Sequence, residues 1–178
     1  MKVFCTLWHE EDVKNDVLLL PNATSKEEEM KIITEFTIEL AKQRTIEEII
    51  KASNYDEVNF LIKEGIRRKR LSMRDETPGK RRIVVLGIDD NISSQEVLAE
   101  ARRMGLSRPT YGDTFLLGEK YPDKQNSGLI VFLHDPQYSW SGYFFDLFLD
   151  ISSKDRIISM VSSGGSWHSG FLFAFRGR

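Results

Sequence analysis

The sequence is poor in the residues that form cross-links and metal centres. Cys5 is the single cysteine among 178 residues, so no disulfide can form within the chain. A reducing compartment is the simplest setting for such a chain, which predicts a cytoplasmic location. The three histidines, His9, His134 and His168, are far apart, and none has the spacing of a metal-binding motif. We therefore expect neither a metal site nor a cofactor.

Long apolar runs and a strong net charge are also missing. No apolar run approaches the roughly 20 residues that a membrane-spanning helix needs. The N-terminus has one early lysine, Lys2, and turns acidic from Glu10, which does not match a secretory signal peptide. A net charge of -2 argues against attraction of the whole chain to nucleic acid. With 40% hydrophobic and 29% charged residues, residues 1–178 are expected to form one soluble domain.

Residues 1–79 are expected to form an N-terminal strand and a helical region. Apolar and β-branched residues predict strands at 2–8 and 17–20. The capping box Ser25-x-x-Glu28 precedes apolar residues at helical spacing, and together they predict a helix from Lys26 to Lys42.

Two shorter helices are expected after that one. The capping box Thr45-x-x-Glu48 opens the first of them. The second is predicted over residues 57–64, with Asp56 as its N-terminal cap and Gly65 as its left-handed end.

Residues 66–82 are rich in basic side chains, which can follow a phosphate backbone. No aromatic residue is interleaved with them for base stacking, and no nucleic-acid recognition motif accompanies them. We interpret the segment as a solvated loop or hairpin edge, where cations discourage stray strand pairing. Nucleic-acid binding through residues 67–82 remains the alternative. The cations concerned are Arg67, Arg68, Lys69, Arg70, Arg74, Lys80, Arg81 and Arg82.

The middle of the chain alternates strand and helix signals. A strong strand is predicted over 82–88, followed by a helix that the capping box Ser93-x-x-Glu96 opens and Gly105 ends. Thr110 is expected to cap a further helix, which turns residues 115–117 inward.

Residues 129–178 have a different composition, with eleven aromatic residues and no glutamate. Apolar runs predict strands at 129–133, 143–151, 157–161 and 171–176, and some of these strands are expected to be covered on both faces. The connecting segments are built from Ser, Asp, Tyr, His, Trp and Gly. Antibody loops use the same mixture for recognition, but ordinary β-rich proteins also have such loops, so both readings remain open.

Catalytic motifs are not evident. The chain has no G-x-S-x-G elbow, and Gly164-Gly165-Ser166 precedes a strand rather than the helix that a phosphate loop requires. Cys5 lies in an apolar strand candidate and is interpreted as inert. We therefore expect a protein that is not an enzyme, with an enzyme of unrecognised type around the C-terminal loops as a further possibility.

Two short motifs carry a family resemblance over residues 80–178. Gly105-Leu106-Ser107-Arg108-Pro109-Thr110 opens a helix, and the chain closes with the strand Phe171–Arg176. Together with Gly164-Gly165-Ser166-Trp167, this order resembles the compact C-type lectin-like domains of formylglycine-generating enzymes and of the variable proteins of diversity-generating retroelements. The resemblance implies an α+β, C-type lectin-like fold with additional N-terminal helices.

In such variable proteins, adenine-directed reverse transcription diversifies a C-terminal ligand-binding surface, here about residues 134–170. The resemblance thus implies a non-enzymatic display protein that binds a protein or a surface ligand. The catalytic cysteines of the enzymatic members are absent, and Asp135-Pro136-Gln137 does not match the calcium motifs of sugar-binding lectins. The implied ligand-binding residues are His134, Asp135, Tyr138, Ser139, Trp140, Ser141, Tyr143, Asp146, Ser152, Asp155, Ser163, Trp167, His168 and Ser169.

Overall fold

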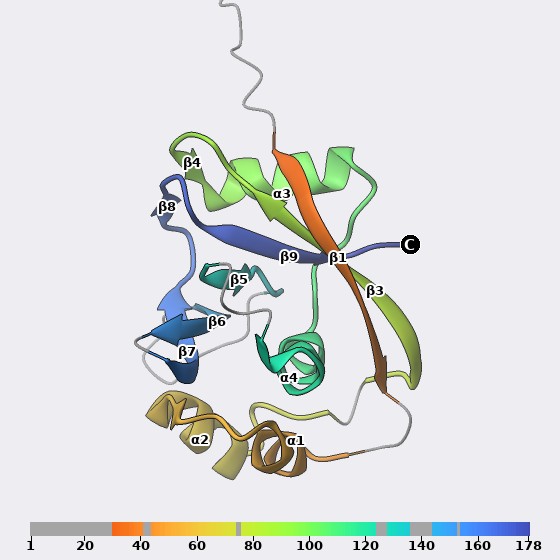
Figure 1. Cartoon of the computed structure of the whole chain (residues 1–178), viewed down its shortest axis with the longest axis vertical. Coiled ribbons are helices and arrows are strands. Elements are labelled where there is room, and N and C mark those ends of the chain that lie inside the picture. Colours follow the sequence, from red (N-terminus) through yellow and green to blue (C-terminus); the bar gives the residue numbers. More distant parts are fainter. Residues whose placement is uncertain (1–29, 41–43, 74–75, 124–127, 136–143, 153) are drawn as a thin grey trace, which may run out of the picture.

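The computed structural model describes residues 30–40, 44–73, 76–123, 128–135, 144–152 and 154–178 (Figure 1). Within these ranges the chain has a mixed α/β fold with four helices and a mostly antiparallel sheet. The expected α+β class is therefore confirmed. The described helices have at most ten residues, and none of them is long and apolar enough to cross a membrane. The strands expected at 2–8 and 17–20 lie outside the described residues.

The main sheet has seven strands in the order β1-β3-β9-β5-β6-β7-β2. β9, the last strand of the chain, lies in the middle of the sheet, antiparallel to β3 and parallel to β5. A separate two-stranded sheet joins β4 to β8. The strands of the main sheet are β1 (Lys31–Leu40), β2 (Glu57–Val58), β3 (Gly79–Gly87), β5 (Ile130–Phe132), β6 (Phe145–Ser152), β7 (Asp155–Ser162) and β9 (Leu172–Arg176); the small sheet consists of β4 (Ile92–Ser93) and β8 (Ser166–Trp167).

Helices cover both faces of the main sheet (Figure 1). One core contains residues of α1 (Ile46–Ser53), α2 (Phe60–Arg67) and α4 (Tyr111–Lys120), and the other contains residues of α3 (Ser94–Arg103). Successive side chains of β9 alternate between the two cores, because neighbouring residues of a strand point to opposite faces. This explains the continuous apolar runs of the central strands.

Three of the four described helices begin where the sequence predicts. The Thr45 and Ser93 side chains accept hydrogen bonds from the backbone N–H groups of Glu48 and Glu96, and both glutamates bond back to their caps. α4 follows Thr110, and its residues from Tyr111 to Gly118 are all buried. α4 is thus a buried helix rather than an amphipathic helix with one face in solvent.

The helix predicted over Lys26–Lys42 is wrong, because residues 31–40 form β1. Phe36, Ile38 and Leu40 are buried while the residues between them are exposed, which is the alternation of a strand. Half of the ten residues are isoleucine or threonine, which favour strands. Pairing with β3 along the whole strand therefore overrides the helical spacing of the apolar residues.

The helix predicted over residues 57–64 is displaced by three residues. Asn59, rather than Asp56, caps α2, and its side chain accepts a hydrogen bond from the N–H of Leu61 at 2.8 Å. The Asp56 carboxylate instead accepts from the backbone N–H of Arg156 at 2.8 Å. Since this bond helps to place β2 beside β7, Glu57 and Val58 are extended and the helix begins later.

The basic segment is not a single solvated loop or hairpin edge. Arg67 belongs to α2, and Arg81 and Arg82 belong to β3, which lies between β1 and β9 in the sheet. The Arg81 side chain is only 11% exposed and pairs with carboxylates, and Arg82 pairs with Glu35. The fold therefore buries Arg81 and divides the basic residues between α2 and β3.

Arg156 of β7 ties together the C-terminal ends of two helices. Its guanidinium donates to the carbonyl oxygens of Ser53, at the end of α1, and of Gly118 in α4, the latter at 2.8 Å. The same guanidinium lies 4.9 Å from the centre of the Tyr55 ring. A cation at the negative ends of two helix dipoles is favourable, and here it also satisfies their carbonyl groups.

Replacing Arg156 with methionine should lower the free energy of unfolding by about 2–4 kcal/mol, because the two carbonyl groups lose charged donors. The measurement is urea unfolding followed by circular dichroism. Arg82→Met is the matched control, since Arg82 forms an exposed pair with Glu35 and its loss should cost much less. Equal losses for the two variants would contradict the bridging role.

Candidate functional site

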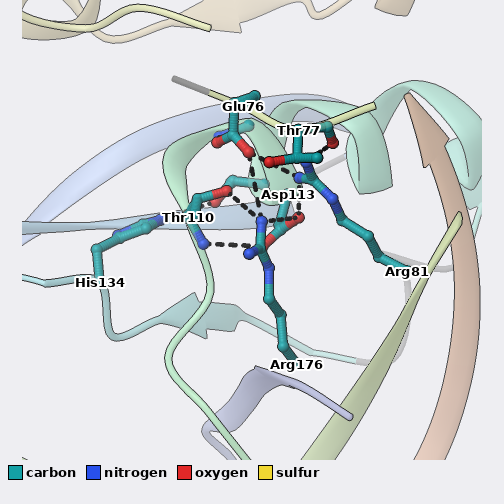
Figure 2. A network of polar contacts seen from close by, with 9 residues as sticks. Glu76, Thr77, Arg81, Thr110, Asp113, His134 and Arg176 are labelled. Atoms are coloured by element: carbon teal, nitrogen blue, oxygen red, sulfur yellow. Dashed lines mark hydrogen bonds and ion pairs between the residues drawn. The ribbon is translucent and has the colours of Figure 1, made fainter. Parts of the chain in front are cut away.

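A buried ion network lies at the N-terminal end of α4 (Figure 2). The Asp113 side chain is fully buried, and its Oδ1 accepts from Arg81 Nη1 at 2.8 Å. Its Oδ2 accepts from Arg176 Nε at 2.5 Å and from the backbone N–H of Thr110 at 2.8 Å. One carboxylate thus joins α4 to both β3 and β9.

Glu76 completes the network. Its Oε2 is 2.8 Å from Arg81 Nη1 and 3.3 Å from Arg176 Nη2, and its Oε1 accepts from the N–H of Gly112 at 3.1 Å. Two carboxylates therefore face two guanidiniums. Burial by itself would lower the pKa of the Arg81 guanidinium, because it disfavours the charged form. The carboxylates of Asp113 and Glu76 outweigh this effect and hold that pKa above its usual value.

His134 lies beside this network, at the end of β5, and is also buried. Its ring stacks on Tyr111 with 4.3 Å between the ring centres. Nε2 is 3.0 Å from Thr114 Oγ1, and Nδ1 is 3.5 Å from the N–H of Leu147. Burial lowers the pKa of His134 to about 3, so the ring is neutral at physiological pH.

Asp146 holds the backbone of His134 in place. Its Oδ1 accepts from the His134 N–H at 3.1 Å, and the Ser163 side chain also donates to it. Burial raises the pKa of Asp146 to about 6, and burial likewise raises the pKa of Tyr111 to about 12. The cluster formed by His134, Asp146 and Tyr111 is therefore a polar part of the interior, where burial disfavours the charged form of each group.

This arrangement stabilises the fold rather than presenting reactive groups to solvent. The imidazole of His134 has polar neighbours at both nitrogens, and the Asp113 carboxylate is surrounded by donors from the chain itself. Among the described residues, no group of three His, Cys, Asp or Glu side chains could hold a metal ion.

Three of the implied binding residues are interior rather than exposed. His134, Asp146 and Trp167 are each 3–4% exposed, so their side chains cannot contribute to an exposed variable face. The burial of His134 could have been predicted from the sequence. Ile130, Phe132 and His134 are two residues apart, which is the spacing of one sheet face, and the first two are buried in β5.

The structure separates the other described candidates. Asp135, His168 and Ser169 are exposed and Ser163 is half-buried. Ser152 and Asp155 are exposed but form the far end of the β6–β7 hairpin, seven residue pairs from the Phe145–Ser162 pair. At about 3.4 Å per residue this separation is roughly 24 Å, so they do not share a surface with Ser163. Tyr138, Ser139, Trp140, Ser141 and Tyr143 lie outside the described residues.

The sequence reasoning missed Glu76, Asp113 and Arg176, which form the densest polar network among the described residues. One signal was present, since Asp113 stands three residues after the cap Thr110, where an acidic residue bonds back to the cap. Its pairing with Arg81 and Arg176 could not be read from the sequence, because 32 and 63 residues separate the partners.

Comparison with family models, curated protein sequences and solved structures finds no match to this chain.

Asp113→Asn should lower the free energy of unfolding by about 3–5 kcal/mol, because it leaves the guanidiniums of Arg81 and Arg176 with Glu76 as their one remaining carboxylate in the network. Urea unfolding is the measurement. Glu35→Gln provides the control at an exposed arginine pair, where a much smaller loss is expected. A small loss for Asp113→Asn would show that the network does not anchor α4.

The dependence of stability on pH should reveal the raised pKa of Asp146. The buried neutral His134 makes the protein less stable as pH falls from about 6.5, since the unfolded chain then binds a proton that the folded protein does not. Asp146 acts oppositely, because the folded protein keeps its proton up to about pH 6 while the unfolded chain loses it near pH 4. Between about pH 4 and 6 the two effects oppose each other.

Asp146→Asn removes one of these opposing effects. Relative to the unaltered protein, the free energy of unfolding of the variant should therefore rise by about 2 kcal/mol between pH 4 and pH 6. Chemical unfolding at a series of pH values measures the difference. Asp135→Asn, at an exposed carboxylate that pairs with Arg108, is the comparison variant. A constant difference for Asp146→Asn would contradict the raised pKa.

Proposed function

We propose that this chain is a non-enzymatic binding protein that presents the exposed side chains of its C-terminal segment to a protein or surface ligand. The observation that carries the proposal is the way in which Trp167 fixes that segment. Its indole is 3% exposed, and Nε1 donates to Ser94 Oγ at 2.8 Å. Its ring also packs edge-on against Phe171 and Phe173.

The backbone around Trp167 is held as firmly as its side chain. β8 pairs with β4, and the N–H of Ser94 donates to the carbonyl of Gly165 at 3.2 Å. Ser166, His168 and Ser169 nevertheless remain exposed on either side of Trp167. A segment that is already ordered loses little conformational entropy on binding, so exposed side chains on it are well suited to recognition.

The C-terminal residues fall into a buried group and an exposed group. His134, Asp146 and Trp167 set the conformation, and Asp135, His168 and Ser169 contact the ligand, together with exposed side chains elsewhere in residues 134–170. The contacts of the second group lie at the surface, since exposed Asp135 pairs with Arg108 at 3.5 Å and the ring of exposed His168 lies 4.7 Å from that of Phe171. Its residues can therefore change at small cost in stability.

We extend the proposal to a C-type lectin-like scaffold whose C-terminal region is diversified. Support comes from the motif Gly105–Thr110, which directly precedes α4, and from Gly164–Trp167, which directly precedes exposed His168 and Ser169. A test that is independent of the protein is the gene's surroundings. A near-copy of the region that encodes residues 134–170, differing at adenines and adjacent to a reverse transcriptase gene, is the expected finding.

The triple variant Asp135→Asn, His168→Gln, Ser169→Asn should change the free energy of unfolding by less than about 1 kcal/mol. Trp167→Ala should lower it by about 3–5 kcal/mol, because a buried indole is lost. Urea unfolding compares the two proteins. A loss for the triple variant as large as that for Trp167→Ala would show that these side chains are structural, and the proposal would then fail.

Binding is tested with the same variant. The unaltered protein and the triple variant serve as matched baits in extracts of the cells that express the protein, with quantitative mass spectrometry as the readout. A partner retained by the first and lost by the second is expected, and identical retained sets would contradict the proposed face.

A further inference from the structure

α2 carries the most exposed aromatic ring among the described residues. Phe60 is 71% exposed, whereas Ile62, Gly65 and Ile66 of the same helix are buried. Residues three and four positions apart lie on one face of a helix, so Phe60, Lys63 and Arg67 form an outward row. The fold has thus placed an aromatic side chain beside basic ones, which the sequence of residues 66–82 did not indicate.

An open hollow lies along this row. It has a volume of about 500 Å³ and is lined by Phe60, Leu61, Lys63, Glu64, Arg67 and Arg68. We call this surface the α2 hollow. Apolar side chains from the first turn of the helix and guanidinium groups from its end meet in it, so an occupant needs both an apolar part and an anionic part.

The charge around the α2 hollow is opposite to that of the chain as a whole. Residues 60–70 contain five cations and a single carboxylate, while the net charge of the chain is -2. The carboxylate belongs to Glu64, which pairs with Arg67 and Arg68. These pairs are solvent-exposed and therefore weak, so a phosphate can replace Glu64 at small cost.

We propose that the α2 hollow binds single-stranded nucleic acid, with one base stacked on Phe60 and neighbouring phosphates on Lys63, Arg67 and Arg68. An exposed ring gives a base a stacking platform that does not depend on sequence, and the cations follow the backbone. Seven residues of helix separate Phe60 from Arg67, which corresponds to about 10 Å at 1.5 Å per residue. About three stacked nucleotides, at 3.4 Å each, span this length.

Two features favour a nucleic acid over an acidic peptide. The Phe60 side chain is 71% exposed, so its ring is accessible to a stacking base. An aliphatic side chain of a peptide would instead require a recessed apolar pocket. Three cations, Lys63, Arg67 and Arg68, line the hollow together with the ring, and single-strand-binding proteins combine a positively charged groove with a stacking ring in this way. The stacked base must be unpaired, which selects single strands.

The experiment measures the fluorescence anisotropy of a labelled twelve-residue oligothymidylate as the full-length protein is added in about 50 mM salt. We expect saturable binding that weakens with salt at a log–log slope of about -2, as for three contacts with a single strand. A duplex of the same length and a polyglutamate peptide are the comparison ligands, and both should bind more weakly.

Two variants probe the site in opposite directions. Phe60→Ala should weaken binding about tenfold or more through loss of stacking, and it removes no core contact. Glu64→Gln should tighten binding severalfold, since the guanidiniums of Arg67 and Arg68 lose their competing carboxylate. Phe144→Ala and Lys154→Gln, at exposed positions outside the α2 hollow, should leave the affinity unchanged.

Any of three results would overturn the inference. The first is the absence of binding to the oligothymidylate at low salt. The second is binding that Phe60→Ala does not weaken, which indicates a general attraction between polyions. The third is tighter, Phe60-dependent binding of polyglutamate, which indicates an acidic protein partner. None of these results bears on the C-terminal face, because the α2 hollow contains none of its residues.

Discussion

The fully buried carboxylate of Asp113 is the constraint on which the arrangement of this protein depends. A charged group that is shielded from water is stable only when opposite charges and hydrogen bonds compensate it. Here the guanidiniums of Arg81 and Arg176 compensate the Asp113 carboxylate. Those arginines belong to β3 and β9, two adjacent strands. The start of α4 is therefore held at one position along the sheet, since a displacement of the helix by one turn would separate the buried Asp113 carboxylate from both guanidiniums.

α4 in turn sets the position of the elements around it. Every residue from Tyr111 to Gly118 is buried, and the helix contributes to the same core as α1 and α2. At its C-terminal end the carbonyl of Gly118 binds Arg156 of β7, which also binds the end of α1. Apolar packing supplies most of the stabilisation, and the charged contacts at the two ends select one arrangement among those that packing allows.

The same construction separates interior polar groups from surface ones. His134 and Asp146 are polar residues near the carboxyl end of β5, but their hydrogen bonds are made inside the protein. In the segment after β7 the division occurs between neighbours, because Trp167 enters the core while His168 stays exposed. Residue type alone therefore does not identify a binding face, because the polar residues of the last fifty positions include both buried and exposed side chains.

Local signals in the sequence determined a large part of the fold. The capping boxes at Thr45 and Ser93 and the cap at Thr110 located α1, α3 and α4, and apolar runs located β3, β5, β6, β7 and β9. These signals operate over a few residues, so the chemistry of a short segment is sufficient to read them. They were insufficient at β1, where helical spacing and strand-forming residues coincide and pairing with β3 decides.

The tertiary structure alone decided where the charged side chains find partners. Arg176 lies 63 residues from Asp113 and 100 from Glu76, and no local pattern encodes such a meeting. The fold likewise buried Arg81 of the basic segment against Asp113 and set Phe60 beside Arg67. The physical reason is that burial and charge pairing depend on which elements become neighbours, and that is settled only when the whole sheet assembles.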